Sequence, residues 1–101
     1  MNEQFIELFD TDLVAIPEVV EAAVIGVPDD VLGEAAKAFL VLRRGAPLGA
    51  HEILEHCRSV MPSYMVPREI VLLRSLPLGS SGKVAKVHLR DPEIVAKLLA
   101  R

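Results

Sequence analysis

The alternation of apolar and polar side chains predicts an opening helix followed by two strands. Over residues 3–15, apolar side chains recur at helical spacing, with acidic and polar side chains between them. Pro17 ends this helix, because the residue before a proline is pushed out of the α region. Residues 19–27 form an apolar run rich in β-branched side chains, which is typical of a strand. Residues 36–42 are expected to form a second strand antiparallel to the first.

The second half of the chain predicts two more helices and a third strand. The helix over 50–61 has the clearest stripe, with apolar side chains at i, i+3, i+4, i+7, i+10 and i+11 from its first residue. Residues 70–73 are expected to form a strand, and a last helix over 92–101 begins with Asp91 as its N-cap. The pattern predicts one α+β domain over residues 1–101, a small, mostly antiparallel three-stranded sheet flanked by about four helices.

Charge is divided unevenly along the chain. Residues 1–36 contain nine acidic side chains and no Lys or Arg, whereas residues 37–101 contain all 11 Lys and Arg against five acidic side chains. Two interpretations stay open: the two segments attract each other or are simply solvated, or the basic segment meets an anionic ligand such as a phosphate. Basic patches interleaved with aromatic residues are absent, so nucleic acid is not an expected partner.

Several classes of protein are disfavoured by what the sequence lacks. No apolar run is long enough to cross a bilayer, and the first residues carry no basic side chains of the kind that a secretory signal needs. A single cysteine excludes an internal disulfide and a cysteine-cluster metal site. With a hydrophobic content of 51% but no Trp, the core is expected to be aliphatic. We expect a cytoplasmic protein with no membrane span.

Most of the side chains that could bind a metal or act as a nucleophile are expected to have structural or solvated roles instead. His51 and His56 are five positions apart, which places them about 140° apart around a helix, so we expect solvated side chains and no metal site. Cys57 belongs to the apolar stripe and is expected to be a buried thiol. The pair Asp29-Asp30 is expected to form a turn.

Lys83 stands out because it follows the loop Gly79-Ser80-Ser81-Gly82. Such a loop exposes backbone N–H groups and two hydroxyls, and a lysine beside it can reach a phosphate or carboxylate as a point charge. The loop is not a Walker loop, because the GxxxxGK[ST] spacing is missing. From composition alone, a solvated surface lysine remains the alternative.

Four motifs follow one another along the chain: E-A-A-V-I-G-V-P-D at residues 21–29, Gly33-Glu34 with Ala38-Phe39, P-S-Y-M-V-P at 62–67, and L-P-L-G-S-S-G-K-V at 76–84, followed by Leu89-Arg90. In their order and spacing they resemble the C-terminal domain of the adenylate-forming (AMP-binding) enzyme superfamily. This superfamily includes acyl-CoA synthetases, aryl-CoA ligases and peptide-synthetase adenylation domains. Together they cover roughly residues 13–90.

The resemblance implies a function and a catalytic residue. Members use ATP to activate a carboxylic acid to an acyl-adenylate, and then pass the acyl group to the thiol of coenzyme A or of a carrier-protein phosphopantetheine. The small domain swings between two poses, and Lys83 would enter the active site in the adenylating pose. Ser81 and Gly82 would belong to the loop that presents it. The resemblance implies ATP, Mg²⁺ and a thiol acceptor for the complete enzyme, and none bound by this domain alone.

The resemblance also implies a partner, namely the large N-terminal ATP-binding domain, which is absent from this chain and would act in cis or in trans. An acyl carrier protein is a further candidate. The family's hinge and Gly-Tyr-Arg-Ile type motif do not occur in residues 1–10, Gly79 stands in place of the usual threonine, and Ile16 in place of the usual histidine. These departures bear on thiol transfer. Because no phosphate cradle is present, the isolated chain is expected to be inactive. The rival hypothesis is a non-catalytic interaction module that binds or regulates a synthetase.

Overall fold

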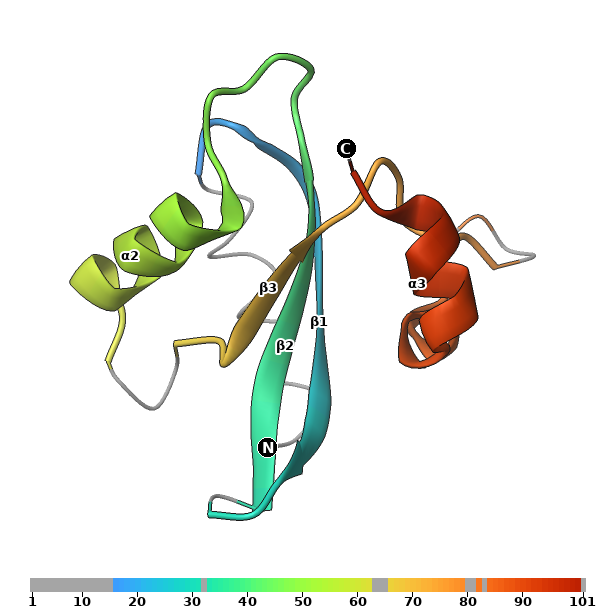
Figure 1. Cartoon of the computed structure of the whole chain (residues 1–101), viewed down its shortest axis with the longest axis horizontal. Helices are drawn as coiled ribbons and strands as arrows, with labels where there is room; N and C mark the ends of the chain where they lie inside the picture. The colour runs from blue at the N-terminus through green and yellow to red at the C-terminus, as the bar shows by residue number, and fades with distance from the viewer. Residues whose placement is uncertain (1–15, 32, 63–65, 80–81, 83, 101) are drawn as a thin grey trace.

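The computed structural model describes residues 16–31, 33–62, 66–79, 82 and 84–100. The helix expected over residues 3–15 lies outside them. Along the described chain the order of elements is two strands, a helix, a third strand, a 3-10 helix and a last helix (Figure 1). Their bounds are β1 Val19–Asp29, β2 Gly33–Leu42, α2 Ala50–Val60, β3 Glu69–Leu72, η2 Lys86–Arg90 and α3 Pro92–Leu98.

The three strands form one sheet in the order β1-β2-β3, so β2 is central. β1 and β2 pair antiparallel, with Val24 opposite Ala38, as the sequence predicts. β2 and β3 pair parallel, with Leu40 opposite Leu72. The sheet is therefore mixed, and the expectation of a mostly antiparallel sheet was wrong. The reason is α2, which carries the chain back along the sheet after β2, so that β3 starts at the same end.

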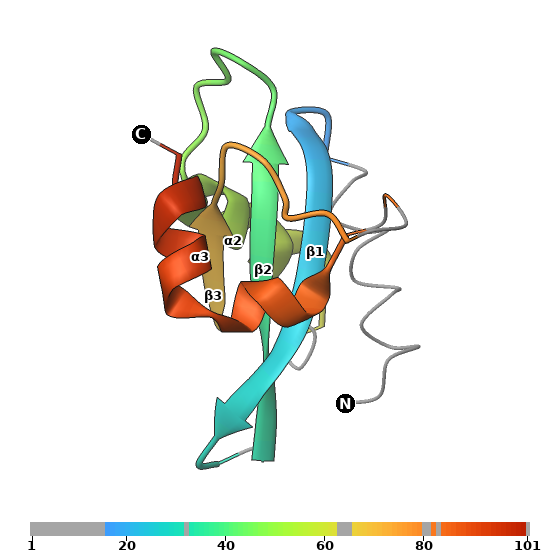
Figure 2. The same cartoon turned by 90° about the vertical axis from the view of Figure 1, so that its right-hand side faces the viewer.

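Both faces of the sheet are buried. α2 covers one face, while η2 and α3 cover the other (Figures 1 and 2). Because successive side chains of a strand point to opposite faces, β2 directs Ala38 and Leu40 towards α2 and Phe39 towards η2. Each of these three side chains has an exposed fraction of 0%. This double covering explains why the strands are almost continuously apolar.

The two described α-helices follow the sequence pattern closely. α2 buries Ile53 and Cys57 against the sheet, and the Glu52 carboxylate accepts a hydrogen bond from the backbone N–H of Gly49 at 2.9 Å. α3 begins as predicted, with the Asp91 carboxylate accepting from the N–H of Glu93 at 3.0 Å. The described residues hold two α-helices and one 3-10 helix, rather than about four helices. Residues 86–90 form a 3-10 helix that the periodicity did not predict.

The C-terminal segment pairs with the chain at the end of β3. After α3 ends, Leu99 pairs antiparallel with Leu73, and the N–H of Ala100 donates to the carbonyl of Leu72 at 3.0 Å. The N–H of Arg74 also donates to the carbonyl of Leu98 at 2.7 Å. Backbone groups at this end of the strand therefore have partners within the domain. Within the described segments, no helix has both the length and the apolar character needed to cross a membrane.

Candidate functional site

The loop that leads to Lys83 has a closed stem. Lys83 and Ser81 lie outside the described residues, so the exposure of Lys83 stays a prediction. Gly82 is described; it is exposed and has φ 80°, a left-handed conformation that glycine adopts without steric cost. The stem is closed by an antiparallel bridge between Leu78 and Val84.

Two backbone hydrogen bonds reinforce this stem. The N–H of Ala85 donates to the carbonyl of Pro77 at 2.8 Å, and the N–H of Gly82 donates to the carbonyl of Gly79 at 3.0 Å. Below the stem, the side chain of Leu76 is buried in the same core layer as Phe39. The chain therefore leaves the core at Leu76, and the described residues on the two sides of the loop, Leu78 and Val84, lie beside each other. Both described sides of the stem are therefore attached to the folded domain.

After the loop, the chain is bound to the edge of β1 that faces away from β2. Lys86, the first residue of η2, donates from Nζ to the carbonyl of Val24 at 3.1 Å. Arg90, the last residue of η2, donates from its guanidinium to the carbonyl of Gly26 at 2.8 Å. Between them, Leu89 is buried among the side chains of the second core layer. Sequence reasoning missed both contacts, because the acceptors are backbone carbonyls 62 and 64 positions away and no side-chain type marks them.

The first two family-like motifs meet at the hairpin of β1 and β2. A Cβ atom at Gly26 would lie 1.5 Å from Oε1 of Glu34, so the Glu34 side chain occupies the space that a side chain at position 26 would need. At the end of β1, one carboxylate oxygen of Asp29 accepts from the N–H of Val31 at 2.8 Å, which confirms the predicted turn. The other oxygen accepts from Arg68 at 2.6 Å. This ion pair joins the acidic and the basic segments of the chain.

The predicted exposure of His51 and His56 and the predicted burial of Cys57 are confirmed. His51 and His56 are exposed on α2, and Cys57 is fully buried beneath it. Burial raises the pKa of the Cys57 thiol, because an apolar environment disfavours the thiolate. Across the part of the chain that the structure describes, no group of three or more His, Cys, Asp and Glu side chains could hold a metal ion.

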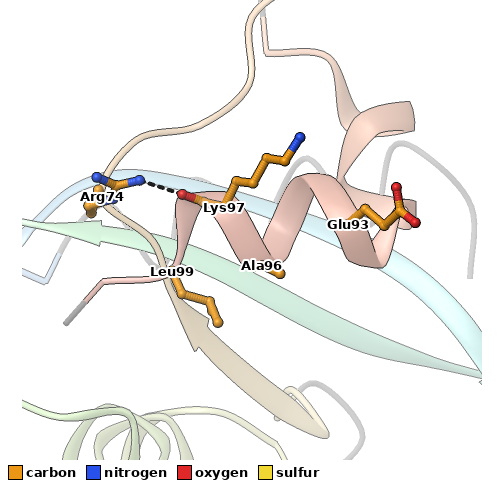
Figure 3. Close-up of a pocket in the computed structure, with 5 residues that line it drawn as sticks. All are labelled: Arg74, Glu93, Ala96, Lys97 and Leu99. Carbon is orange, nitrogen blue, oxygen red and sulfur yellow. Dashed lines mark hydrogen bonds between the residues drawn. The ribbon is translucent and has the colours of Figure 1, made fainter.

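In the part of the chain that the structure describes, two open hollows beside α3 share Ala96 and Leu99 in their lining. The larger, about 740 Å³, is lined by Arg74, Glu93, Ala96, Lys97 and Leu99 (Figure 3). The Arg74 guanidinium donates to the carbonyl of Lys97 at the end of α3, where a cation satisfies the last carbonyls of a helix. The smaller hollow, about 390 Å³, lies between α3 and β1. The described residues of the Lys83 loop line neither of them.

Comparison with known proteins agrees with this architecture. The family model described as "AMP-binding enzyme C-terminal domain" matches residues 10–83. The chain is 46% identical over 77 residues to a 2-methylpropanoate–CoA ligase of Humulus lupulus, an alignment that covers 74% of this chain and 14% of that protein. It is 43% identical over 77 residues to a long-chain-fatty-acid–CoA ligase of Yersinia pestis, covering 76% of this chain and 14% of the relative.

Solved structures of similar proteins superpose on this chain. ATP-bound MatB from Rhodopseudomonas palustris superposes with a TM-score of 0.77 at 30% identity, over 84% of this chain and 17% of that one. The amide bond synthetase McbA from Marinactinospora thermotolerans also gives 0.77, at 34% identity over the same shares. The chain thus spans about one seventh of the length of the curated relatives it matches. On these matches, the chain belongs to the family of AMP-binding enzyme C-terminal domains, within the acyl-CoA ligase and adenylate-forming superfamily.

Proposed function

We propose that this domain is the C-terminal part of an acyl-CoA synthetase-like ligase and supplies Lys83 for the ATP-dependent activation of a carboxylic acid to an acyl-adenylate. The observation that carries the proposal is the extent of the family match, which runs from residue 10 through Lys83 itself. The closed stem supports it, since Leu78 and Val84, which stand on the two sides of the loop in the sequence, pair with each other on the domain.

The chemistry suits a lysine in this position. When a carboxylate attacks the α-phosphorus of ATP, negative charge shifts between the two groups and the pyrophosphate leaves. An aimed ammonium group stabilises that charge more in the transition state than in the ground state, which is how it accelerates the step. A compact ammonium on a flexible four-carbon stem can reach between carboxylate and phosphate oxygens.

The remaining components belong to the partner domain in this proposal. The loop before Lys83 lacks Walker spacing, so we assign ATP and Mg²⁺ to a large N-terminal domain, joined in cis or in trans. The acceptor thiol of coenzyme A or of a phosphopantetheine would enter between the two domains after adenylation. An ATP-bound structure of the relative MatB is consistent with this arrangement.

A domain exchange tests the proposal. The large domain of the Humulus lupulus 2-methylpropanoate–CoA ligase is joined to residues 10–101 of this chain in place of its own C-terminal domain, and we call this protein the chimera. We expect the chimera to show exchange of labelled pyrophosphate into ATP that depends on 2-methylpropanoate. This chain alone and the truncated large domain alone should show no exchange.

The same experiment distinguishes the adenylation role from the rival hypothesis, a non-catalytic interaction module. Such a module would bind the truncated large domain in trans without restoring exchange, and the chimera would be inactive. A folded chimera that gives no exchange, with a circular dichroism spectrum matching that of the parent ligase, would therefore contradict the adenylation role.

A further inference from the structure

Two side chains that follow Lys83 in the sequence end on the outer edge of strand β1. β1 is an edge strand, paired only with β2 within the described sheet. The carbonyls of Val24 and Gly26 are two residues apart, so they point to the same side of the strand. Lys86 and Arg90 donate to these two carbonyls at 3.1 and 2.8 Å. Both bonds are partly buried, where a charged donor forms a stronger hydrogen bond than a neutral one.

The two contacts hold η2 at both of its ends. Lys86 is the first and Arg90 the last of its five residues, and Leu89 is buried in the core layer beneath it with an exposed fraction of 3%. Figure 2 shows η2 crossing in front of β1, with the chain from the Lys83 loop arriving at its start. η2 is thus fixed along β1 by two cations and one apolar side chain, although its own backbone forms only a short 3-10 turn.

Only one residue connects η2 to the stem of the Lys83 loop. Ala85 separates Val84 from Lys86, and its N–H donates to the carbonyl of Pro77 on the other side of the stem. The position of the strand that returns from the loop therefore depends on where η2 is held. Releasing η2 from β1 would leave the returning side of the stem attached through the Leu78–Val84 bridge and this one hydrogen bond.

We propose that Lys86 and Arg90 are positioning residues for adenylation. By holding η2 on the edge of β1, they fix the stem of the loop and so the direction from which Lys83 reaches the reacting groups. This inference rests on the proposed function of Lys83. A misplacement of about 1 Å in a catalytic group can lower a rate by on the order of 10²-fold, so a small shift of the stem is enough to matter.

The test uses Lys86→Met in the chimera, a change that keeps most of the apolar stem and removes the donor. We expect pyrophosphate exchange to fall by about 10- to 100-fold in kcat, with the KM for ATP nearly unchanged. Transfer to coenzyme A from synthetic 2-methylpropanoyl-adenylate should keep its rate. Lys86→Arg should restore most of the exchange, because it returns a cationic donor to the carbonyl of Val24. Lys97→Met, which removes an exposed cation from α3, is the matched control and should leave both rates unchanged.

A double variant distinguishes positioning from a general loss of structure. If Lys86 acts only through Lys83, Lys83→Ala with Lys86→Met should be no slower in exchange than Lys83→Ala alone. Hydrogen exchange on this chain alone gives a second readout: the Ala85 amide should exchange faster in Lys86→Met and in Arg90→Leu, while the amides of α2 stay unchanged.

The outcomes are separable. If Lys83→Ala retains full exchange, the proposed function of Lys83 fails. If Lys83→Ala abolishes exchange while Lys86→Met and Arg90→Leu do not affect it, only the positioning inference is overturned. A double variant slower than Lys83→Ala, or an equal loss in both half-reactions, would likewise overturn it, because both results indicate a structural defect.

Discussion

Individual residues in this domain owe their roles to their surroundings more than to their type. Cys57 could be a nucleophile by type, yet it lies beneath α2 with no exposed surface and an elevated thiol pKa. Asp29 could be a metal ligand by type, yet it ends β1 through a turn and an ion pair with Arg68. By type alone Lys86 is an ordinary surface lysine, yet its ammonium group donates a hydrogen bond to the backbone of β1.

The buried thiol gives a pH prediction. Because the pKa of Cys57 is raised above its usual value of 9.0 in the folded chain, the unfolded chain loses the proton first as pH rises. The stabilisation associated with this group is complete below about pH 9 and is lost as pH rises through the folded pKa, with a slope of at most about 1.4 kcal/mol per pH unit.

Urea unfolding of the isolated chain between pH 7 and 10.5 measures this effect. The comparison is with Cys57→Ala, which should be less stable at pH 7 because it leaves a cavity in the core. The difference between the two proteins should shrink above pH 9. A difference that stays constant up to pH 10.5 would show that the thiol is not held protonated.

At the scale of elements, a helix or strand could be predicted where a local pattern of apolar side chains marks it. The β-branched run of β1 and the stripe of α2 are local patterns, and both elements were predicted within two residues of their bounds. The parallel pairing of β3 was not predictable in this way, because it results from the crossover through α2. η2 was missed because five residues of a 3-10 turn, Lys86–Arg90, carry no α-helical period.

The start of α3 provides a prediction for a single element. Asp91→Ala removes the carboxylate that accepts the N–H of Glu93, and should lower the free energy of unfolding by about 1 kcal/mol. Asp91→Ser should recover most of this loss, because its hydroxyl can accept the same bond. Thermal or urea unfolding followed by circular dichroism measures both. If the Ala and Ser variants are equally stable, the cap contributes nothing, and α3 is held by its packing on the sheet and by the pairing of Leu99 with Leu73.

At the scale of the whole molecule, the domain is a small sheet covered on both faces and fastened at both edges. The C-terminal segment pairs with the end of β3, and Lys86 and Arg90 bind two carbonyls of β1. The family was predictable from the sequence, since four motifs occur in the order and at the spacing of that family. The edge contacts around the candidate site were not, because backbone carbonyls such as those of Val24 and Gly26 leave no mark in the sequence.

The central claim is that Lys83 serves the adenylation step and that step only. The most direct measurement is of the two half-reactions separately, in the chimera and its Lys83→Ala variant. We expect formation of the acyl-adenylate to fall by on the order of 10²–10³-fold, the usual cost of losing one aimed electrostatic group in a closed site. Lys83→Arg should fail as well, because a planar guanidinium does not replace a compact ammonium.

Transfer of the acyl group from synthetic 2-methylpropanoyl-adenylate to coenzyme A should be nearly unaffected by Lys83→Ala, since the resemblance to adenylate-forming enzymes implies that this residue leaves the active site before the second step. The unfolding temperature should also be unchanged. A large loss confined to adenylation is the result that the account predicts. An equal loss in both half-reactions, or no loss in either, would contradict it.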